Sequence, residues 1–281
     1  CADDVDNEVD FKDTIEVTAS NVSELPKTNS RRYVVYDRIS KSMIIGKNED
    51  VKSAMASTTK IMTTIVILEK ADLNEKLTVS AKAGGTGGSR LGLKRGDKAS
   101  VRDLLYGLML RSGNDAAVAL AEHVGGSVKG FAELMNEKAI ELGLTNTHFV
   151  TPHGLDDANH YTTALELAKL TDYAMNNETF AKIVGTKSTT IYINNQSRQI
   201  NNTNELLGVL NGVVGVKTGF TNNAGRCLVT ETKRNNMDII TIVLGADTKK
   251  DRTKDSVNLI EYTFSKYKMY NLEEQIIKEF N

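Results

Sequence analysis

Ser57 and Lys60 place a hydroxyl and an amine three residues apart in a segment that is otherwise largely apolar. In a helix, side chains at this spacing lie on one face and can touch. Burial disfavours the charged form of an amine, so a lysine in such a helix can accept the proton of a neighbouring hydroxyl. The pattern predicts an activated serine nucleophile and therefore an acyl-transfer enzyme.

Two further motifs follow Ser57 in the chain, Ser112-Gly113-Asn114 and Lys217-Thr218-Gly219. The order Ser-x-x-Lys, Ser-x-Asn, Lys-Thr-Gly resembles that of penicillin-binding proteins and serine β-lactamases, although Gly113 stands where those proteins have Asp. A second Ser-x-x-Lys at 265–268 lies in a polar stretch typical of a solvated helix end. Each motif alone also fits a helix cap, a turn or a strand end, and their joint order favours the catalytic interpretation.

A closer resemblance is to the D-alanyl-D-alanine carboxypeptidases, over residues 31 to 268. Outside the three motifs it rests on the segments 96–97, 142–149, 153–156, 160–164 and 245–248. It implies a β-lactamase/transpeptidase-like fold and cleavage of the terminal D-alanine from peptidoglycan stem peptides through an acyl-enzyme, with β-lactams as covalent inhibitors. Family members commonly continue into a β-rich domain and an anchor helix, and we expect neither in this chain.

The resemblance also assigns roles to residues. Ser57 is expected to be the nucleophile, Lys60 its base, Ser112 a proton relay and Asn114 a ligand of both Lys60 and the substrate. The backbone N–H groups of Ser57 and Phe220 are expected to form an oxyanion hole. Binding of the substrate, including its terminal carboxylate, is expected from Lys217, Thr218, Gly219, Phe220 and, less directly, Arg252.

The predicted elements favour an α/β (α+β) architecture in which an antiparallel sheet is flanked by helices. Strands are expected at 32–36, 42–45, 227–230 and 239–244, with no strand in the long interval between the first and second pairs. Helices are expected to begin at Ser57, Ser100 and Thr163, to run through 131–142, and to close the domain at 251–267. We expect a lobe from 31–75 and 205–281, an inserted and mostly helical lobe at 76–204, and an acidic tail at 1–30.

Composition excludes several classes of protein. The 281 residues carry 35 basic and 36 acidic side chains. The chain therefore has no excess of basic residues that would predict binding to nucleic acid. No apolar run reaches the length of a membrane span, and no Cys/His cluster has zinc spacing. We expect an exported bacterial monomer without cofactors. Cys1 fits a trimmed end better than a lipoprotein anchor, and we predict no lipidation. Cys227 is expected to be a buried thiol.

Three alternative functions are disfavoured. A Ser-His-Asp hydrolase is disfavoured because no Gly-x-Ser-x-Gly elbow exists, and the four histidines read as structural. A class A-like β-lactamase needs a carboxylate that activates the deacylating water, usually in a Glu-x-x-Leu-Asn stretch. The run Glu133-Leu134-Met135-Asn136 has neither the spacing nor the Leu of that stretch. A silent binding protein of the same fold would retain costly buried polar groups without use. The run Gly84–Gly88 is expected to be a loop near the cleft and not a phosphate loop.

Overall fold

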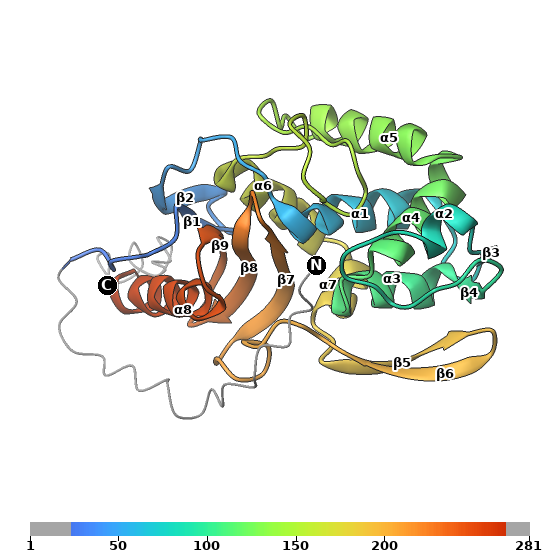
Figure 1. Ribbon diagram of the computed structural model, residues 1–281. Coiled ribbons are helices and arrows are strands. Elements are labelled where there is room, and N and C mark those ends of the chain that lie inside the picture. The colour runs from blue at the N-terminus through green and yellow to red at the C-terminus, as the bar shows by residue number, and fades with distance from the viewer. Residues whose placement is uncertain (1–23, 268–281) are drawn as a thin grey trace, which may run out of the picture.

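The computed structural model describes residues 24–267. These residues form an antiparallel sheet with helices packed on both of its faces (Figure 1). The five-stranded sheet has the order β2-β1-β9-β8-β7. Its strands are β1 (Arg32–Asp37), β2 (Ser42–Lys47), β7 (Val213–Thr221), β8 (Gly225–Arg234) and β9 (Met237–Ala246). The two ends of the described chain therefore meet in one sheet, as the sequence predicts, and β7 lies at its edge.

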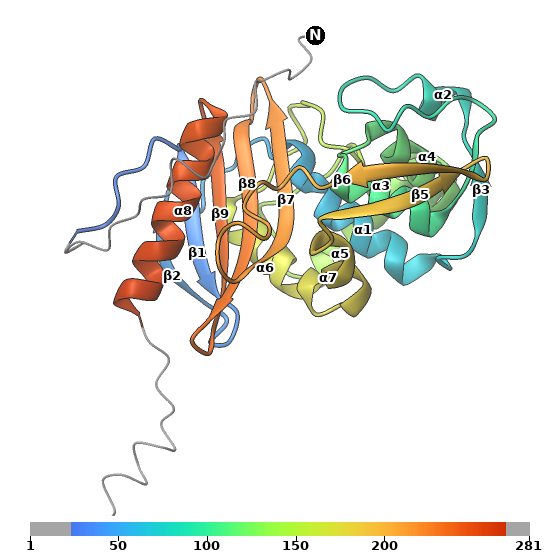
Figure 2. The ribbon, with the colours of Figure 1, turned by 90° about the horizontal axis from the view of Figure 1, so that it is seen from below.

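The helices divide between the two faces of this sheet (Figure 2). Helix α8 (Lys249–Lys266) covers one face alone, against β8 and β9. Helix α6 (Ala164–Met175) packs on the opposite face, against β1 and β9. Beyond α6 lie α1 (Lys60–Lys70), α3 (Val101–Leu110), α4 (Asn114–Gly125), α5 (Val128–Glu141) and α7 (Glu178–Val184). The antiparallel sheet flanked by helices confirms the predicted fold class.

Strand β1 is apolar on both faces because both faces of the sheet are covered. Val34 and Tyr36 belong to the large core beneath the helices, whereas Tyr33 and Val35 pack with Leu259 of α8. Alternate side chains of a strand point to opposite faces, so a strand between two layers has no polar face. A continuous apolar run of this kind marks a central strand.

Local capping residues fix the helix starts that the sequence predicts. The Ser100 side chain accepts a hydrogen bond from the Asp103 N–H and begins α3, and Thr163 does the same for α6 through the Glu166 N–H. These bonds satisfy N–H groups that the first helical turn leaves unpaired. Asn235 and Asn236 have φ of 49° and 62°, which suits the tight turn between β8 and β9.

The prediction that the middle of the chain lacks strands is wrong. A second antiparallel sheet has the order β3-β4-β5-β6 and consists of β3 (Lys76–Thr78), β4 (Lys98–Ser100), β5 (Ser188–Ile193) and β6 (Gln196–Asn201). β3 and β4 are only three residues long, too short for a period-2 pattern to register. β5 and β6 are largely exposed, and their turn at Asn194-Asn195 has positive φ like that at Asn235-Asn236.

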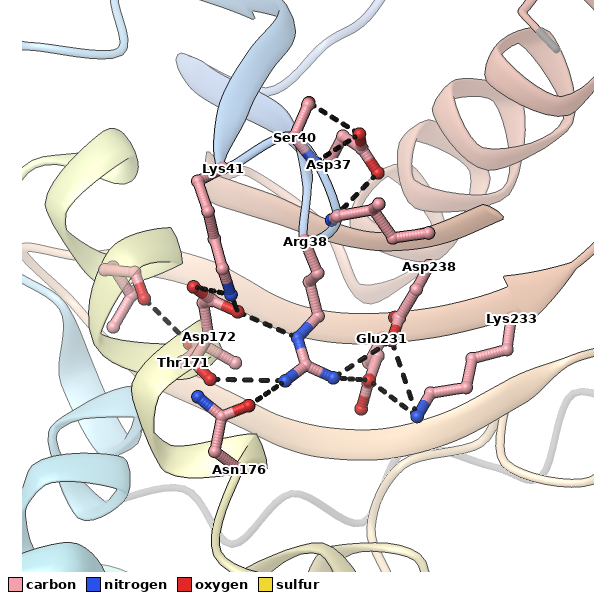
Figure 3. Close-up of polar contacts among 12 residues, drawn as sticks. Asp37, Arg38, Ser40, Lys41, Thr171, Asp172, Asn176, Glu231, Lys233 and Asp238 are labelled. Atoms are coloured by element: carbon pink, nitrogen blue, oxygen red, sulfur yellow. Dashed lines mark hydrogen bonds and ion pairs between the residues drawn. The ribbon is translucent and has the colours of Figure 1, made fainter. Parts of the chain in front are cut away.

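A cluster of charges ties α6 to the sheet (Figure 3). The Arg38 guanidinium contacts Asp172 of α6 at 3.0 Å, Glu231 of β8 at 2.5 Å and Asp238 of β9 at 3.0 Å. Lys41 and Lys233 complete it at the rim, next to Asp172 and to the Glu231–Asp238 pair respectively. We call these six residues the Arg38 network.

Candidate active site

Ser57 lies in a 3₁₀ turn, η2 (Ala56–Thr59), that leads directly into α1. The edge strand β7 runs against this turn. A Cβ at Gly219 would lie only 3.0 Å from the Ser57 backbone nitrogen and 3.2 Å from the Ala56 Cβ. Glycine at 219 therefore allows the β7 backbone to reach the turn that carries the hydroxyl.

Lys60 is fully buried and its Nζ has three oxygen neighbours. It lies 2.9 Å from Ser57 Oγ, 2.8 Å from Asn114 Oδ1 and 2.9 Å from the His153 carbonyl oxygen. None of the three is a carboxylate, and among residues 24–267 no ion pair involves Lys60. The amine is thus hydrogen-bonded but not charge-compensated.

This environment moves the pKa of Lys60 well below that of a free lysine. Burial is the largest cause, the nearby Lys217 ammonium adds to it, and Asp115 opposes it weakly. Asp115 itself accepts the backbone N–H groups of residues 91, 92 and 93, which occupies its oxygens. A lysine in this state can take a proton from a hydroxyl 2.9 Å away.

Three side chains of η2 and α1 form hydrogen bonds with the segment 147–163. Thr59 Oγ1 lies 2.7 Å from His160 Nε2, Lys60 bonds the His153 carbonyl, and Thr63 Oγ1 donates to the Pro152 carbonyl at 2.6 Å. Gly154 is pressed so closely onto η2 that a Cβ there would lie 1.9 Å from the Ala56 carbonyl oxygen. These contacts fix the position of the oxygen that holds Lys60.

The junction between α3 and α4 supplies the second motif. Ser112 is buried with φ of 59°, a left-handed conformation that non-glycine residues rarely adopt. Asn114 begins α4, and its Nδ2 donates to the Gly87 carbonyl at 2.8 Å while its Oδ1 accepts from Lys60. Within residues 24–267 no hydrogen bond joins the Ser112 hydroxyl to Ser57 or Lys60.

Strand β7 carries the third motif along the open edge of the sheet. Lys217 is fully buried and donates to the Thr218 carbonyl at 2.9 Å, and Thr218 Oγ1 lies 2.8 Å from Thr203 Oγ1. Burial and the charge of Arg252 lower the pKa of Lys217 to about 7. Phe220 is 44% exposed, with the Arg226 guanidinium carbon 3.9 Å from the centre of its ring.

Arg252, in the first turns of α8, is buried and forms an ion pair with Glu205. Thr253 donates to the same carboxylate, and Lys249 lies 3.2 Å from its other oxygen. The Arg252 Nε is buried without a hydrogen-bond partner. Arg252 is close enough to Lys217 to shift its pKa, so the two cations belong to one region of positive charge.

Glu133 and Ser265, which resemble parts of catalytic motifs, face solvent. Glu133 is exposed on α5, and Ser265 is exposed in the last turn of α8. All four histidines form hydrogen bonds within the protein, and burial and Lys60 lower the pKa of His153 to about 3. Cys227 is a free buried thiol; Cys1 lies outside the described residues.

Sequence reasoning missed the groups that hold the motif side chains. The carbonyls of His153 and Gly87 position Lys60 and Asn114, and Glu205 and Thr203 hold Arg252 and Thr218. A backbone carbonyl leaves no mark in residue type. The only signal was indirect: Gly84–Gly88 and Gly154 provide the close approaches through which these carbonyls reach the site.

Within residues 24–267 no group of three His, Cys, Asp or Glu side chains is arranged to hold a metal ion. None of the helices in that range combines the length and the hydropathy of a bilayer span.

Comparison with known proteins agrees with this geometry. The family model of the D-alanyl-D-alanine carboxypeptidases matches residues 18–248. The chain is 37% identical over 245 residues to DacF of Bacillus subtilis, covering 85% of this chain and 63% of that one. It is 38% identical over 270 residues to DacC of Escherichia coli, covering 88% and 64%. The chain therefore spans less than two thirds of the length of these two relatives.

Solved structures give the same result. The crystal structure of the Streptomyces K15 DD-transpeptidase superposes with a TM-score of 0.82 at 34% identity, covering 86% of this chain and 99% of that one. The carboxypeptidase DacD of Francisella tularensis superposes with a TM-score of 0.81 at 31% identity, covering 87% and 72%. Motif order, side-chain geometry and fold thus agree, and the chain belongs to the D-alanyl-D-alanine carboxypeptidase family.

Proposed function

We propose that this protein is a serine-type D,D-carboxypeptidase that removes the terminal D-alanine from peptidoglycan stem peptides through an acyl-enzyme. The observation that carries the proposal is the 2.9 Å contact between Ser57 Oγ and the buried amine of Lys60. Among residues 24–267 this amine has no carboxylate partner. An amine whose pKa is depressed by burial and by Lys217 is matched to abstract a hydroxyl proton.

In the proposed reaction, Lys60 takes the Ser57 proton while Oγ attacks the carbonyl of the penultimate D-alanine. The backbone N–H groups of Ser57 and Phe220 are proposed to hold the oxyanion. The close approach of Gly219, the chain neighbour of Phe220, to the Ser57 nitrogen supports this assignment. Ser112 relays the proton to the departing amine. Water then hydrolyses the ester and regenerates Ser57.

Substrate recognition is proposed at β7. The strand is at the sheet edge, so an extended peptide can add to it as a further antiparallel strand. Lys217, Thr218 and Arg252 are proposed to attract the terminal carboxylate, since two cations share this region and Arg252 Nε lacks a partner. Asn114 retains a second Nδ2 hydrogen for the substrate backbone after bonding Gly87.

The same proposal places the protein outside the bacterial cytoplasm, as an exported monomer acting on the cell wall without a cofactor and without nucleic acid. β-Lactams are its proposed inhibitors, because their strained amide would acylate the same serine. We also propose a catalytic unit over 31–281 made of a sheet lobe and an inserted helical lobe at 76–204. The expected acidic tail at 1–30 lies mostly outside the described residues, as do residues 268–281.

Mass spectrometry of the intact protein after incubation with a penicillin tests this function. One covalent adduct per chain, recovered on the peptide that contains Ser57, is the expected result. Absence of an adduct together with absence of D-alanine release from a D-Ala-D-Ala peptide would contradict the proposal.

The fate of the adduct separates a carboxypeptidase from a β-lactamase. The penicilloyl group stays in the cleft, and attack by water then needs a positioned carboxylate base. Glu133 is exposed on α5 and cannot supply it. A chromogenic cephalosporin in excess should give a stoichiometric burst and then very slow turnover, whereas sustained turnover at roughly tens per second would identify a β-lactamase.

A further inference from the structure

A pocket of about 470 Å³ opens beside the candidate active site, at the far end of the open edge of β7. Its walls are residues 52–54, the loop 157–161, and Asn223 in the turn after β7. We call it the lateral pocket. None of the residues assigned to the proposed reaction lines it.

The walls of the lateral pocket are held in place by bonds to the catalytic elements. Ser53 and Thr162 exchange backbone hydrogen bonds of 2.8 and 3.0 Å, and His160 bonds Thr59 next to Lys60. On the other side, Thr221 at the end of β7 donates to Asp156 at 2.6 Å. The pocket is therefore built into the same framework as the nucleophile.

Two charged side chains in the walls of the pocket, Lys52 and Asp157, form no ion pair within the described part of the chain. Lys52 Nζ lies 4.6 Å from the centre of the Tyr161 ring, and one Asp157 oxygen accepts only the backbone N–H of Asn159 within its own loop. Among residues 24–267 neither charge has an ion-pair partner. A pocket whose walls carry one cation and one anion, each without an ion-pair partner in that range, matches a zwitterionic ligand.

The pocket also lies in line with a peptide bound to β7. When the terminal carboxylate is at Lys217 and Thr218 and the scissile carbonyl at Phe220, an antiparallel peptide continues toward Thr221. At about 3.3 Å per residue, the residue before the two terminal D-alanines comes opposite Thr221. Thr221 bonds the loop that forms the pocket, and Asn223 lines it two residues further on. A long side chain at that position can reach the pocket.

We propose that the lateral pocket binds the side chain of the residue preceding the two terminal D-alanines, and selects one that ends in both an ammonium and a carboxylate. Asp157 pairs with the ammonium, and Lys52 and Asn223 with the carboxylate. This inference rests on the proposed carboxypeptidase function and extends it to the substrate's third residue.

The test compares three synthetic peptides, acyl-X-D-Ala-D-Ala, with X as meso-diaminopimelate, lysine or norleucine. The parent enzyme is expected to prefer diaminopimelate to norleucine in kcat/KM by at least about tenfold, the size of a charge-assisted pairing. Asp157→Asn should lower kcat/KM about tenfold for both amine-bearing peptides. Lys52→Gln should lower it for the diaminopimelate peptide only, and norleucine should change less than about twofold in either variant.

Lys129→Gln and Glu137→Gln, both exposed on α5, are the matched charge controls and should leave all three rates unchanged. Calorimetric binding to the Ser57→Ala protein should rank the peptides in the same order and does not depend on turnover. Equal hydrolysis of the three peptides, or equal losses on all three in the variants, would overturn the lateral-pocket inference alone. If no peptide releases D-alanine, the proposed function fails, and the binding ranking still decides the inference.

Discussion

The molecule buries charge in two places and treats it in opposite ways. In the Arg38 network a guanidinium is surrounded by three carboxyl groups and two lysines. Burial disfavours the charge of Arg38, but Glu231, Asp172 and Asp238 outweigh that effect and raise its pKa. In the candidate active site two lysines are fully buried without any carboxylate contact among residues 24–267, and both pKa values are lowered.

The difference separates a structural cluster from a reactive one. A compensated charge gains hydrogen bonds that hold elements together, here α6 against β1, β8 and β9. An uncompensated buried ammonium destabilises the fold in its charged form, and this is the condition under which lysine becomes a base or attracts an anion. The two clusters therefore differ in what their removal should do to activity and to stability.

The largest effect is expected from the nucleophile. Ser57→Ala should lower D-alanine release by at least about a thousandfold and abolish penicillin labelling, because members of a covalent catalytic unit act together. Ser265→Ala removes the serine of the other Ser-x-x-Lys motif, which is exposed at the end of α8, and should have parental activity. An inactive Ser265→Ala with an active Ser57→Ala would reverse the assignment.

The free energy of unfolding should fall when the Arg38 network loses its cation, and should change little when the active site loses one. Arg38→Met leaves Glu231, Asp172 and Asp238 without their shared cation, and we expect a loss of about 3 kcal/mol, or about 6 °C in Tm. Lys217→Met removes a buried cation that has no carboxylate partner in the described chain, and its stability should stay within about 1 kcal/mol of the parent or rise. Calorimetric melting of both variants gives the measurement; similar losses would mean that the two clusters are equivalent.

Within the active site, the two lysines should differ from one another. Lys60→Arg should fold and be nearly inactive, by roughly a hundredfold or more, because a guanidinium cannot be deprotonated at working pH. Lys217→Arg should retain more activity, since its proposed task is electrostatic. Steady-state kinetics on one D-Ala-D-Ala peptide compares them, and equal losses would remove the distinction between base and carboxylate ligand.

Much of this arrangement was readable from the sequence because its causes are local. The Ser100 and Thr163 caps, the buried run at Tyr33 to Tyr36 and the Asn235-Asn236 turn each carry their structural cause in a few neighbouring residues. The second sheet was not readable: β3 and β4 are too short to show periodicity, and most side chains of β5 and β6 face solvent.

In the candidate active site, too, the sequence predicts the motif residues but not the groups that hold them. Ser57, Lys60 and Asn114 could be grouped by motif order, and the structure brings them within hydrogen-bond distance. The carbonyls of His153 and Gly87 and the Arg38 network depend on segments far apart in the chain, with no residue pattern to link them. Polar partners at large sequence separation are visible only once the fold is known.

The pH dependence of kcat/KM should report both lysines of the free enzyme. Lys60 must be neutral to act, so activity rises with pH through its lowered pKa. Lys217 must be charged to attract the carboxylate, so activity falls as pH rises through about 7. Arg252→Gln removes a cation that lowers the Lys217 pKa, and should move this alkaline limb to higher pH. A limb that stays in place would show that Lys217 does not produce it.

The smallest effect concerns Glu231 in the Arg38 network. Burial, and then the neighbouring Asp238, raise its pKa above that of an ordinary glutamate. The folded protein therefore binds this proton more tightly than the unfolded chain, so the contribution of Glu231 to stability is fully present below the unfolded pKa of about 4.3 and declines as pH rises through the raised value. Glu231→Gln keeps a neutral side chain at every pH. Its stability relative to the parent should thus improve by about 1 kcal/mol between pH 5 and pH 8, measured by denaturant unfolding, whereas Glu137→Gln, exposed on α5, should give a constant difference. Parallel curves for Glu231→Gln would mean that Glu231 is charged throughout, and that Arg38 compensates it as fully as it does Asp172.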